Sequence, residues 1–409
     1  MIQLKLIPFL FLLIFGTSQC SSQQTQEAAK ETIAITSLLV PAKLKVGAAQ
    51  VNKYLPLIKG KKIALVVNQT STIGQVHLVD SLNSLGIDIV AIFAPEHGFR
   101  GKADAGEQVA DGKDLKTGIP LLSLYGKNKK PSAKQLAGID WVLFDIQDVG
   151  ARFYTYISTM HYVMDACAEH QVPFMVLDRP NPNGHYVDGP VLDKKFTSFV
   201  GMHPIPIVHG MTVGEYAKMV NGEGWLTGGQ QCALSVIACE NYTHNTVYSL
   251  PIKPSPNLPN SRSIYLYPSL CLFEGTQVSV GRGTNTQFQV YGHPDLKNAP
   301  YEFTPVSMEG AKYPKHENQR CKGYNLQAIP IINLQQKHGF NLSYLLESYQ
   351  DFDAKSSFFL KNLFFDKLAG TDQLRLQIIA GKTEAEIRDS WQAGLNAFKA
   401  TRNKYVIYE

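Results

Sequence analysis

The sequence predicts an α/β fold built on a doubly wound parallel sheet, on the strength of two observations. Short apolar runs recur between residues 62 and 178, and both faces of each run are apolar, as in buried parallel strands. Segments with the helical spacing of apolar side chains lie between these runs. Strands that alternate with helices are typical of a parallel sheet with helices on both faces.

Five strands and two helices are expected in this half of the chain. We expect a helix over 76–85 after the first strand and a helix over 157–167 before the fifth, because apolar residues recur there every three or four positions. The expected strands are 62–68, 88–94, 120–125, 140–145 and 173–178.

After about residue 200 the alternation of strands and helices weakens. Thr212 and Glu215 have the spacing of a capping box, which predicts a helix over 211–225. Five prolines between residues 251 and 268 remove backbone donors, so a long ordered loop or a domain boundary is expected there. The helices expected beyond residue 342 are 343–349, 358–368 and 383–399.

Length and composition limit the class of protein. A chain of 409 residues is long enough for two domains, or for one large domain with an appendage. Hydrophobic residues make up 44% and charged residues 18%, which excludes a mostly disordered chain. The net charge of +5 is spread without a basic run, so nucleic acid is not an expected partner.

The first twenty residues predict an export signal. Lys5 precedes an apolar run over 6–15, which is too short to span a membrane because a transmembrane helix needs about 20 apolar residues. Small and polar residues then lead to Cys20, as at a bacterial lipoprotein processing site. We expect a signal peptide over 1–20, a tether over 21–45, and an exported periplasmic or cell-envelope lipoprotein held at the membrane only by lipid on Cys20. Ordinary cleavage beside an incidental cysteine is the alternative.

Five cysteines remain after Cys20, and none belongs to a Cys-x-x-Cys pair. This pattern indicates no metal cluster, so we expect buried free thiols with at most one disulfide. The five are Cys167, Cys232, Cys239, Cys271 and Cys321.

Polar residues cluster where three of the expected strands end. The carboxyl ends of parallel strands meet at one edge of a sheet, so we expect these residues to form a ligand site. Acids that pair with arginines for structural reasons alone are the alternative. Each exit carries a carboxylate and an arginine, in the pairs Glu96 and Arg100, Asp148 and Arg152, and Asp178 and Arg179.

Absent motifs narrow the chemistry. The sequence has no Gly-x-Ser-x-Gly elbow, no Walker loop, no glycine-rich dinucleotide motif after the first strand and no His-Glu-x-x-His pattern. Carboxylates with arginines to hold an anionic substrate fit hydrolysis of a glycosidic bond, in which one acid protonates the leaving oxygen. No cofactor and no metal are expected. The alternative, a metal held by scattered histidines, would use His97, His161, His203 and His209.

Longer motifs carry a resemblance to a known family. The matching segments are FAPEHGFRG at 93–101, DIQDVGARFYTY at 145–156, DRPNP at 178–182, PSPNLP at 254–259 and GRGTN at 281–285. With these segments, the chain resembles the exo-β-N-acetylmuramidase family, glycoside hydrolase family 171, formerly a domain of unknown function. The resemblance extends from about residue 62 to about residue 408.

The resemblance implies an enzyme that releases N-acetylmuramic acid from the non-reducing end of peptidoglycan fragments. It also implies a Rossmann-like catalytic domain, here 46–260, and a smaller α+β auxiliary domain, here 261–409, with the site in the cleft between them. Glu96 is implied as the acid/base, and burial beside neighbouring phenylalanines would help it to keep its proton. A salt bridge from Glu96 to Arg100 is the structural alternative.

The second catalytic group is expected from the loop after the fourth strand. Asp148 is preferred to Asp145, because Asp145 is expected to lie inside the strand end. His97 is expected to contact substrate or to tune the proton of Glu96. Retention or inversion stays open because it depends on the separation of two carboxyl groups. Assistance by the 2-acetamido group of the substrate also stays open.

Arginines are expected to bind the lactyl carboxylate of N-acetylmuramic acid. Arg152 and Arg282 are the expected bidentate partners, with Arg100 behind them. Glycines on both sides of Arg282 would allow a close approach. The expected sugar contacts are Tyr154, Tyr156 and Asn285, although aromatic residues at this spacing also fit a core.

Two other functions compete with this interpretation. A non-catalytic cell-wall sugar-binding lipoprotein would share the two-lobed cleft and the export signal. A peptidoglycan amidase or esterase is the second alternative, and the missing metal and serine motifs weaken it.

Overall fold

The computed structural model describes residues 43–96, 98–99 and 111–408. The expected signal peptide and Cys20 lie outside these residues, as do His97 and Arg100. No helix in the described part combines the length and the apolarity that a membrane crossing requires.

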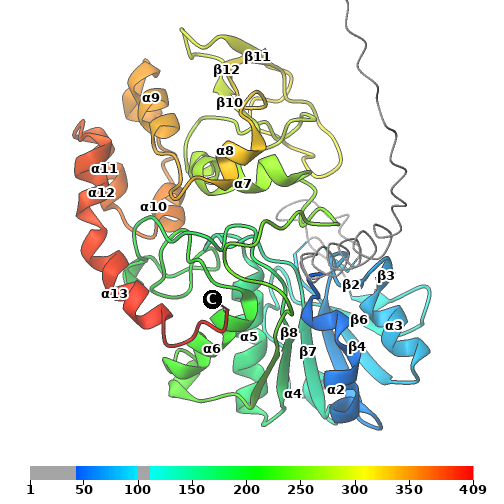
Figure 1. Cartoon of the computed structure of the whole chain (residues 1–409). Coiled ribbons are helices and arrows are strands. Elements are labelled where there is room, and N and C mark those ends of the chain that lie inside the picture. Colours follow the sequence, from blue (N-terminus) through cyan, green and yellow to red (C-terminus); the bar gives the residue numbers. More distant parts are fainter. Residues whose placement is uncertain (1–42, 97, 100–110, 409) are drawn as a thin grey trace, which may run out of the picture. The chain divides into compact units, whose positions relative to one another are not determined.

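A seven-stranded sheet forms the centre of the fold, in the order β5-β6-β4-β1-β7-β8-β9 (Figure 1). All neighbouring strands are parallel except β5, which runs antiparallel to β6. The predicted α/β fold with a parallel sheet is therefore confirmed. The strands are β1 (Lys62–Val67), β4 (Asp88–Ala94), β5 (Gly112–Lys113), β6 (Pro120–Ser123), β7 (Trp141–Asp145), β8 (Phe174–Leu177) and β9 (Leu234–Ile237).

Helices cover both faces of this sheet, as the doubly wound prediction requires. Ala64 and Val66 of β1 belong to a hydrophobic cluster with α5 and α6, whereas Ile63 and Leu65 belong to a second cluster with α2 and α3. Side chains that alternate along a strand thus fill two separate layers. The helices are α2 (Val51–Ile58), α3 (Leu78–Ser84), α5 (Tyr156–Glu169) and α6 (Val213–Gly222), and a short α4 (Ala133–Leu136) precedes β7.

Two of these helices are shorter than predicted. The first residues of the segment expected as a helix over 76–85 form a small hairpin of β2 (Thr72–Ile73) and β3 (Val76–His77), so α3 begins only at Leu78. In α6 the capping box is present, since the backbone N–H of Thr212 donates to Oε2 of Glu215 at 2.9 Å and the Thr212 side chain accepts from the Glu215 N–H.

The chain then forms a smaller α+β part. Residues 251–260 form no helix or strand, in agreement with the proline content. They lead into α7 (Ser261–Leu270) and the 3-10 helix η4 (Cys271–Gly275), and Pro268 lies inside α7 rather than in a loop. A three-stranded antiparallel sheet follows, made of β10 (Val290–His293), β12 (Cys321–Asn325) and β11 (Tyr301–Phe303).

Short helices complete this part. The predicted helix over 358–368 is confined to its second half, and the helix predicted over 383–399 breaks at Trp391, whose ψ is near 0°. The predicted cap at Thr383 is confirmed. The helices are α8 (Ile331–Gln335), α9 (Ser343–Asp351), α10 (Phe364–Ala369), α11 (Gln373–Ile379), α12 (Glu384–Ser390) and α13 (Gln392–Arg402).

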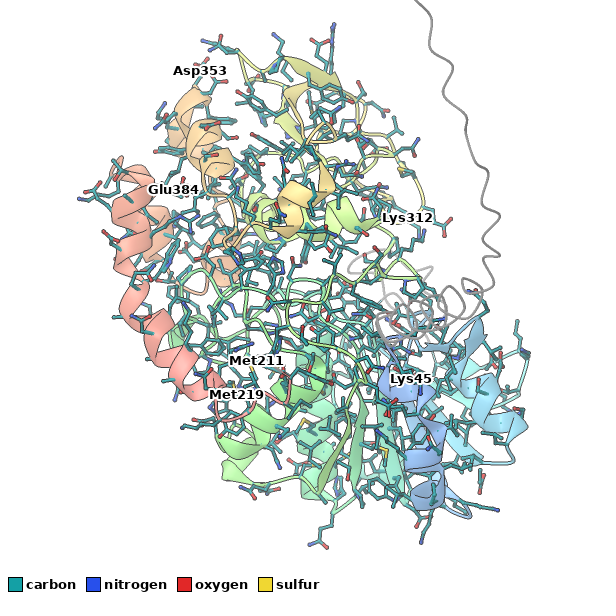
Figure 2. The ribbon with its side chains drawn as sticks, viewed as in Figure 1. Lys45, Met211, Met219, Lys312, Asp353 and Glu384 are labelled. Atoms are coloured by element: carbon teal, nitrogen blue, oxygen red, sulfur yellow. The ribbon has the colours of Figure 1, made fainter. Side chains whose placement is uncertain are left out.

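The two parts share one continuous core. Buried side chains of α5 and α6 belong to the same cluster as those of α7, α10 and α13. Met211 and Met219, labelled in Figure 2, are buried in this cluster near the start and end of α6. The chain end returns to the large sheet, where the Tyr408 hydroxyl donates to Asp178 Oδ2 at 2.5 Å. The five described cysteines are free and buried, as predicted.

Candidate active site

The strand ends that were expected to carry the site lie at one edge of the sheet, because β4, β7 and β8 are parallel. The sequence did not reveal that β1 lies between β4 and β7, so the exits of these two strands are not direct neighbours.

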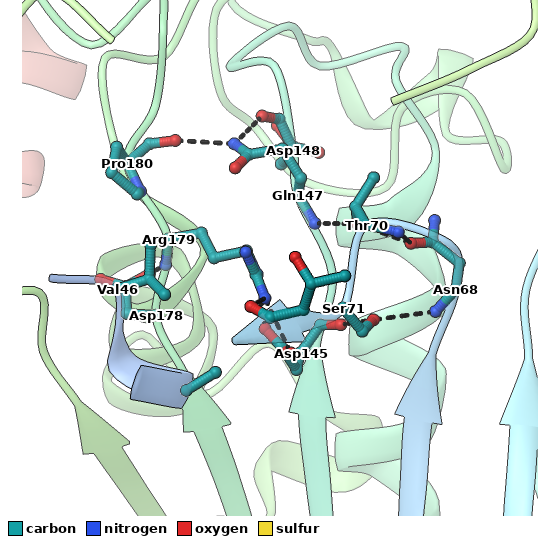
Figure 3. Close-up of polar contacts among 12 residues, drawn as sticks. Val46, Asn68, Thr70, Ser71, Asp145, Gln147, Asp148, Asp178, Arg179 and Pro180 are labelled. Carbon is teal, nitrogen blue, oxygen red and sulfur yellow. Dashed lines mark hydrogen bonds and ion pairs between the residues drawn. The ribbon is translucent and has the colours of Figure 1, made fainter. Parts of the chain in front are cut away.

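A buried polar network holds the ends of β1, β7 and β8 together (Figure 3). Arg179 forms a bidentate ion pair with Asp145, with Nε to Oδ1 at 2.5 Å and Nη2 to Oδ2 at 2.9 Å. The Ser71 hydroxyl donates to the Asp145 carbonyl, and the Gln147 side chain donates to the Pro180 carbonyl at 2.7 Å. Asp145 is therefore structural, as predicted.

Asp148, the expected second catalytic group, is buried in the same network. Its Oδ1 accepts from the Gly150 N–H at 2.7 Å, and its buried Oδ2 has no hydrogen bond to any described residue. Burial raises the pKa of Asp148 to about 7. Asp148 is absent from the set of described residues that line the cavity. The structure thus places Asp148 in the buried network and not in the cavity wall, where a direct catalytic role would require it.

Glu96 follows β4 and is half-buried. The Tyr125 hydroxyl donates to Oε1 at 2.8 Å, and the Thr155 hydroxyl donates to Oε2 at 2.9 Å. Tyr125 lies just beyond β6, and Thr155 is the N-cap of α5. Three separate elements thus meet at this carboxylate and hold both of its oxygens.

A cavity of about 250 Å³ opens at Glu96. Its lining is largely aromatic, and its charged members are Glu96, Glu274 and Arg282. Polar lining groups come from the loop between β7 and α5 and from the proline-rich segment. The remaining lining residues are Tyr125, Phe153, Tyr154, Thr155, Tyr156, Phe199, Val200, Ser255, Asn257, Leu258, Tyr267, Cys271, Phe288, Phe364 and Leu368.

Tyr154 and Tyr156, two expected sugar contacts, both line the cavity. Their hydroxyls donate to the Pro254 carbonyl, at 2.8 and 3.3 Å. The two rings meet edge to face with centroids 5.0 Å apart. Because the hydroxyls are bound to the proline-rich segment, the rings can offer carbon surface to a ligand.

Arg282 also lines the cavity, as the prediction of an anion-binding arginine requires. Its Nε donates to Glu274 Oε1 at 3.0 Å, and its guanidinium lies over the Phe288 ring at 5.0 Å from the centroid. The flanking Gly281 and Gly283 have φ of 75° and 79°, a region that side chains disfavour.

Phe288 supports Arg282 from a strained backbone position. Its φ is 53°, and the left-handed region costs a residue with a side chain about 1–2 kcal/mol. The side chain is fully buried and packs edge to face on Tyr267, with ring centroids 5.0 Å apart. Packing against Tyr267 holds Phe288 in this conformation, in which its ring lies under the Arg282 guanidinium at the cavity.

Arg152 does not fit the predicted role of a substrate ligand. Its guanidinium is buried and donates to the backbone carbonyls of Pro190, Ile205 and Leu368, at 2.9, 2.6 and 2.9 Å. Arg152 thus joins three chain segments.

Asn285, another expected sugar contact, is exposed and outside the set of described cavity-lining residues.

Of the histidines considered as metal ligands, the three that the structure describes, His161, His203 and His209, lie in the core. His203 Nε2 and His161 Nδ1 are 3.0 Å apart, and the His203 ring stacks on Trp225. Burial lowers the pKa of His161 to about 4 and that of His203 to about 3. Across residues 43–96, 98–99 and 111–408, no group of three or more His, Cys, Asp or Glu side chains is arranged to hold a metal ion.

Four residues of the cavity wall were not predicted from the sequence: Tyr125, Thr155, Asn257 and Glu274. Thr155 and Asn257 lie inside the motifs that carried the resemblance, so those motifs contained a usable signal. Tyr125 and Glu274 had no such signal, because each meets its partner only through the tertiary fold.

The chain is similar to known proteins over most of its length. Residues 63–262 match the N-terminal family model of the exo-β-N-acetylmuramidase NamZ, and residues 265–408 match its C-terminal family model. The peptidoglycan β-N-acetylmuramidase NamZ of Bacillus subtilis (strain 168) is 37% identical over 424 residues, which cover 97% of each chain.

Two crystal structures of DUF1343 family proteins from Bacteroides fragilis NCTC 9343 are similar to this fold. One is 49% identical with a TM-score of 0.84, and the other is 28% identical with a TM-score of 0.75. Each comparison covers 90% of this chain and 99% of the other. The chain belongs to the exo-β-N-acetylmuramidase family and is a glycosidase of that family.

Proposed function

We propose that this glycosidase is exo-acting and releases N-acetylmuramic acid from the non-reducing end of peptidoglycan fragments, with Glu96 as the general acid/base. One observation carries the proposal: Glu96 and Arg282 line the same cavity. Glu96 is a carboxylate that two hydroxyls hold in place, and Arg282 is a cation. The named activity of the Bacillus subtilis relative supports a peptidoglycan substrate.

Glu96 supplies the proton that the departing sugar oxygen needs. Glycosidases protonate this oxygen as the anomeric carbon gains positive charge, and general acid catalysis typically contributes about 10²- to 10⁴-fold in rate. Hydrogen bonds from Tyr125 and Thr155 fix the orientation of the carboxyl group before substrate binds. Orientation of this kind lowers the cost of reaching the reactive geometry.

Arg282 recognises the group that distinguishes N-acetylmuramic acid from N-acetylglucosamine. Muramic acid carries a lactyl carboxylate, and a guanidinium binds a carboxylate through two parallel hydrogen bonds. The carbon faces of Tyr154 and Tyr156 pack against the sugar ring. The cavity is small, at about 250 Å³, which supports binding of a chain end and hence exo action.

The test is turnover of a disaccharide in which N-acetylmuramic acid is the non-reducing sugar. We expect the purified protein to release free N-acetylmuramic acid, and Glu96→Gln to lower kcat by about 10³-fold. Glu96→Gln keeps the shape of the side chain and removes the acidic proton. An unchanged melting temperature of this variant shows that its fold is intact. Activity of Glu96→Gln within tenfold of the wild type contradicts the assignment of Glu96.

The same experiment separates the alternatives. Binding of the disaccharide without turnover identifies a sugar-binding protein, and release of peptide rather than sugar identifies an amidase. A longer fragment labelled at its reducing end tests exo action, because an exo enzyme removes one sugar from the other end whereas an endo enzyme cuts internal bonds. Internal cleavage products contradict the exo assignment.

A further inference from the structure

Arg282 belongs to a set of three charged side chains, together with Glu274 and Lys315. Glu274 lies in η4, Arg282 in the loop before β10, and Lys315 in the loop between β11 and β12. Glu274 and Arg282 line the cavity, whereas Lys315 reaches the same region through backbone carbonyls. Two positive charges and one negative charge leave this set with one net positive charge.

Lys315 fixes the backbone that carries Glu274. Its ammonium lies within hydrogen-bond distance of four carbonyls of one segment at the end of η4. A cation is favourable where a helix ends, because the last carbonyls of the helix carry partial negative charge. The carbonyls are those of Phe273 at 3.0 Å, Glu274 at 3.2 Å, Thr276 at 2.7 Å and Val278 at 3.4 Å.

Glu274 in turn orients Arg282. Its Oε1 accepts from Arg282 Nε, the nitrogen nearest to the chain. Neither terminal nitrogen of Arg282 has a hydrogen bond to any other described residue. The guanidinium therefore keeps the two donors that a carboxylate needs for bidentate binding. Phe288 limits its movement from one side.

The charge states of Glu274 and Lys315 agree with a chain of contacts in which Lys315 supports Glu274 and Glu274 supports Arg282. Burial raises the pKa of Glu274, but Arg282 and Lys315 outweigh it and the pKa is lowered overall. Burial lowers the pKa of Lys315, and Glu274 opposes that change. Glu274 is thus ionised and already engaged by Arg282, which favours a positioning role over that of a second catalytic carboxylate.

We propose that Glu274 and Lys315 are positioning residues that hold the terminal nitrogens of Arg282 toward the cavity and so select sugars that carry a carboxylate. The inference rests on the proposed function, since it assigns the selectivity of the same site. It predicts that both residues act on discrimination between substrates, and that neither transfers a proton.

The test compares two chromogenic glycosides, one of N-acetylmuramic acid and one of N-acetylglucosamine, which differ only in the lactyl ether. The ratio of their kcat/KM values is measured for each variant. We expect Glu274→Ala to lower this ratio about tenfold, the value of one charge-assisted hydrogen bond, and to act through KM for the muramic acid glycoside. Glu274→Gln keeps an oxygen for Nε and should recover most of the ratio.

Lys315 is tested in the same way. We expect Lys315→Met to lower the ratio and Lys315→Arg to recover part of it, because arginine can still donate to the carbonyls. Arg320→Ala is the matched control, since Arg320 forms an exposed ion pair with Glu302 outside the cavity lining. The melting temperature of each variant shows whether its fold is intact.

Three outcomes overturn the inference. A folded Glu274→Ala with an unchanged ratio shows that Glu274 does not position Arg282. A higher ratio in both Glu274→Ala and Glu274→Gln shows that Glu274 acts only through its negative charge and does not position Arg282. Loss of kcat by about 10³-fold on both substrates in Glu274→Gln shows a catalytic carboxylate.

Arg282→Met separates this inference from the proposed function. If Arg282→Met leaves the ratio unchanged, the proposed recognition of the lactyl carboxylate is wrong. If Arg282→Met abolishes discrimination while the Glu274 and Lys315 variants keep it, only the positioning role is wrong. If the wild type cleaves neither glycoside, the proposed catalytic function is wrong.

Discussion

The Tyr125 hydroxyl donates a hydrogen bond of 2.8 Å to Oε1 of Glu96 and so connects the end of β6 to the end of β4. Thr155 holds the other oxygen from the start of α5. A carboxylate with both oxygens bound cannot rotate without breaking a hydrogen bond. The candidate acid/base is therefore oriented by two strands and a helix before any substrate arrives.

Loss of either hydroxyl should lower turnover. We expect Tyr125→Phe and Thr155→Val each to reduce kcat by up to about tenfold with little change in KM, because one hydrogen bond that orients the carboxyl group contributes roughly 0.5–1.5 kcal/mol. Steady-state kinetics on the muramic acid glycoside measure both values. Tyr405→Phe is the control, since its hydroxyl donates to Glu223 at 2.7 Å and neither residue lines the cavity. Full kcat in Tyr125→Phe would show that orientation of Glu96 does not limit the reaction.

Asp148 should make the stability of the protein depend on pH. Burial raises its pKa from 3.8 to about 7, so between these values the folded protein binds a proton that the unfolded chain has lost. Stability therefore falls as the pH rises through this window. Asp148→Asn keeps an oxygen for the Gly150 N–H and has no charge to bury. We expect it to melt above the wild type at about pH 8, by about 1–2 °C for each kcal/mol recovered, and to lose this advantage near pH 4.

Asp145→Asn is the contrasting variant. Asp145 is fully buried and ion-paired with Arg179, so the substitution leaves a buried guanidinium without its counter-charge. Breaking a buried pair in this way typically costs about 3–5 kcal/mol. We expect Asp145→Asn to melt well below the wild type at both pH values. A pH profile of Asp148→Asn that runs parallel to the wild type would show that Asp148 is not the titrating group.

Arg152 should be important for stability and not for selectivity. Its guanidinium joins the Pro190, Ile205 and Leu368 carbonyls, and a lysine cannot reproduce that planar set of donors. We expect Arg152→Lys to lower the melting temperature, with a cost of roughly 1–3 kcal/mol for buried acceptors left without donors. The ratio of activity on the two glycosides should stay at the wild-type value. A lower ratio with an unchanged melting temperature would restore the substrate-binding role.

The sequence was most informative where burial was complete. Strands such as β1 and β7 were predicted because both faces are apolar. The edge strand β9 (Leu234–Ile237) is half-exposed along its whole length and has no such pattern. The break between α12 and α13 at Trp391 has no glycine or proline within two residues to mark it. Tertiary packing determines whether such residues form a strand or end a helix, and a local sequence pattern does not contain that information.

The same limit applies to the site. Glu96 and Arg282 were predicted and both line the cavity. Arg152 was predicted for the same reason as Arg282, but a position in a loop does not determine the direction of a side chain, and this one turns into the core. Glu274 and Lys315 are far apart in sequence and meet only because the loop between β11 and β12 packs on η4.

The N-terminal segment leads to a prediction about location. We propose that Cys20 becomes the first residue of the mature protein and carries a lipid anchor. More than one acyl chain, or a second membrane-binding signal, is needed for stable membrane attachment, because a single chain binds only marginally. We expect mass spectrometry of the mature protein to find an acylated N-terminus at Cys20, and globomycin to accumulate a form that keeps residues 1–19. An unacylated N-terminus at any position would contradict the anchor, while the proposed chemistry at Glu96 would be unaffected.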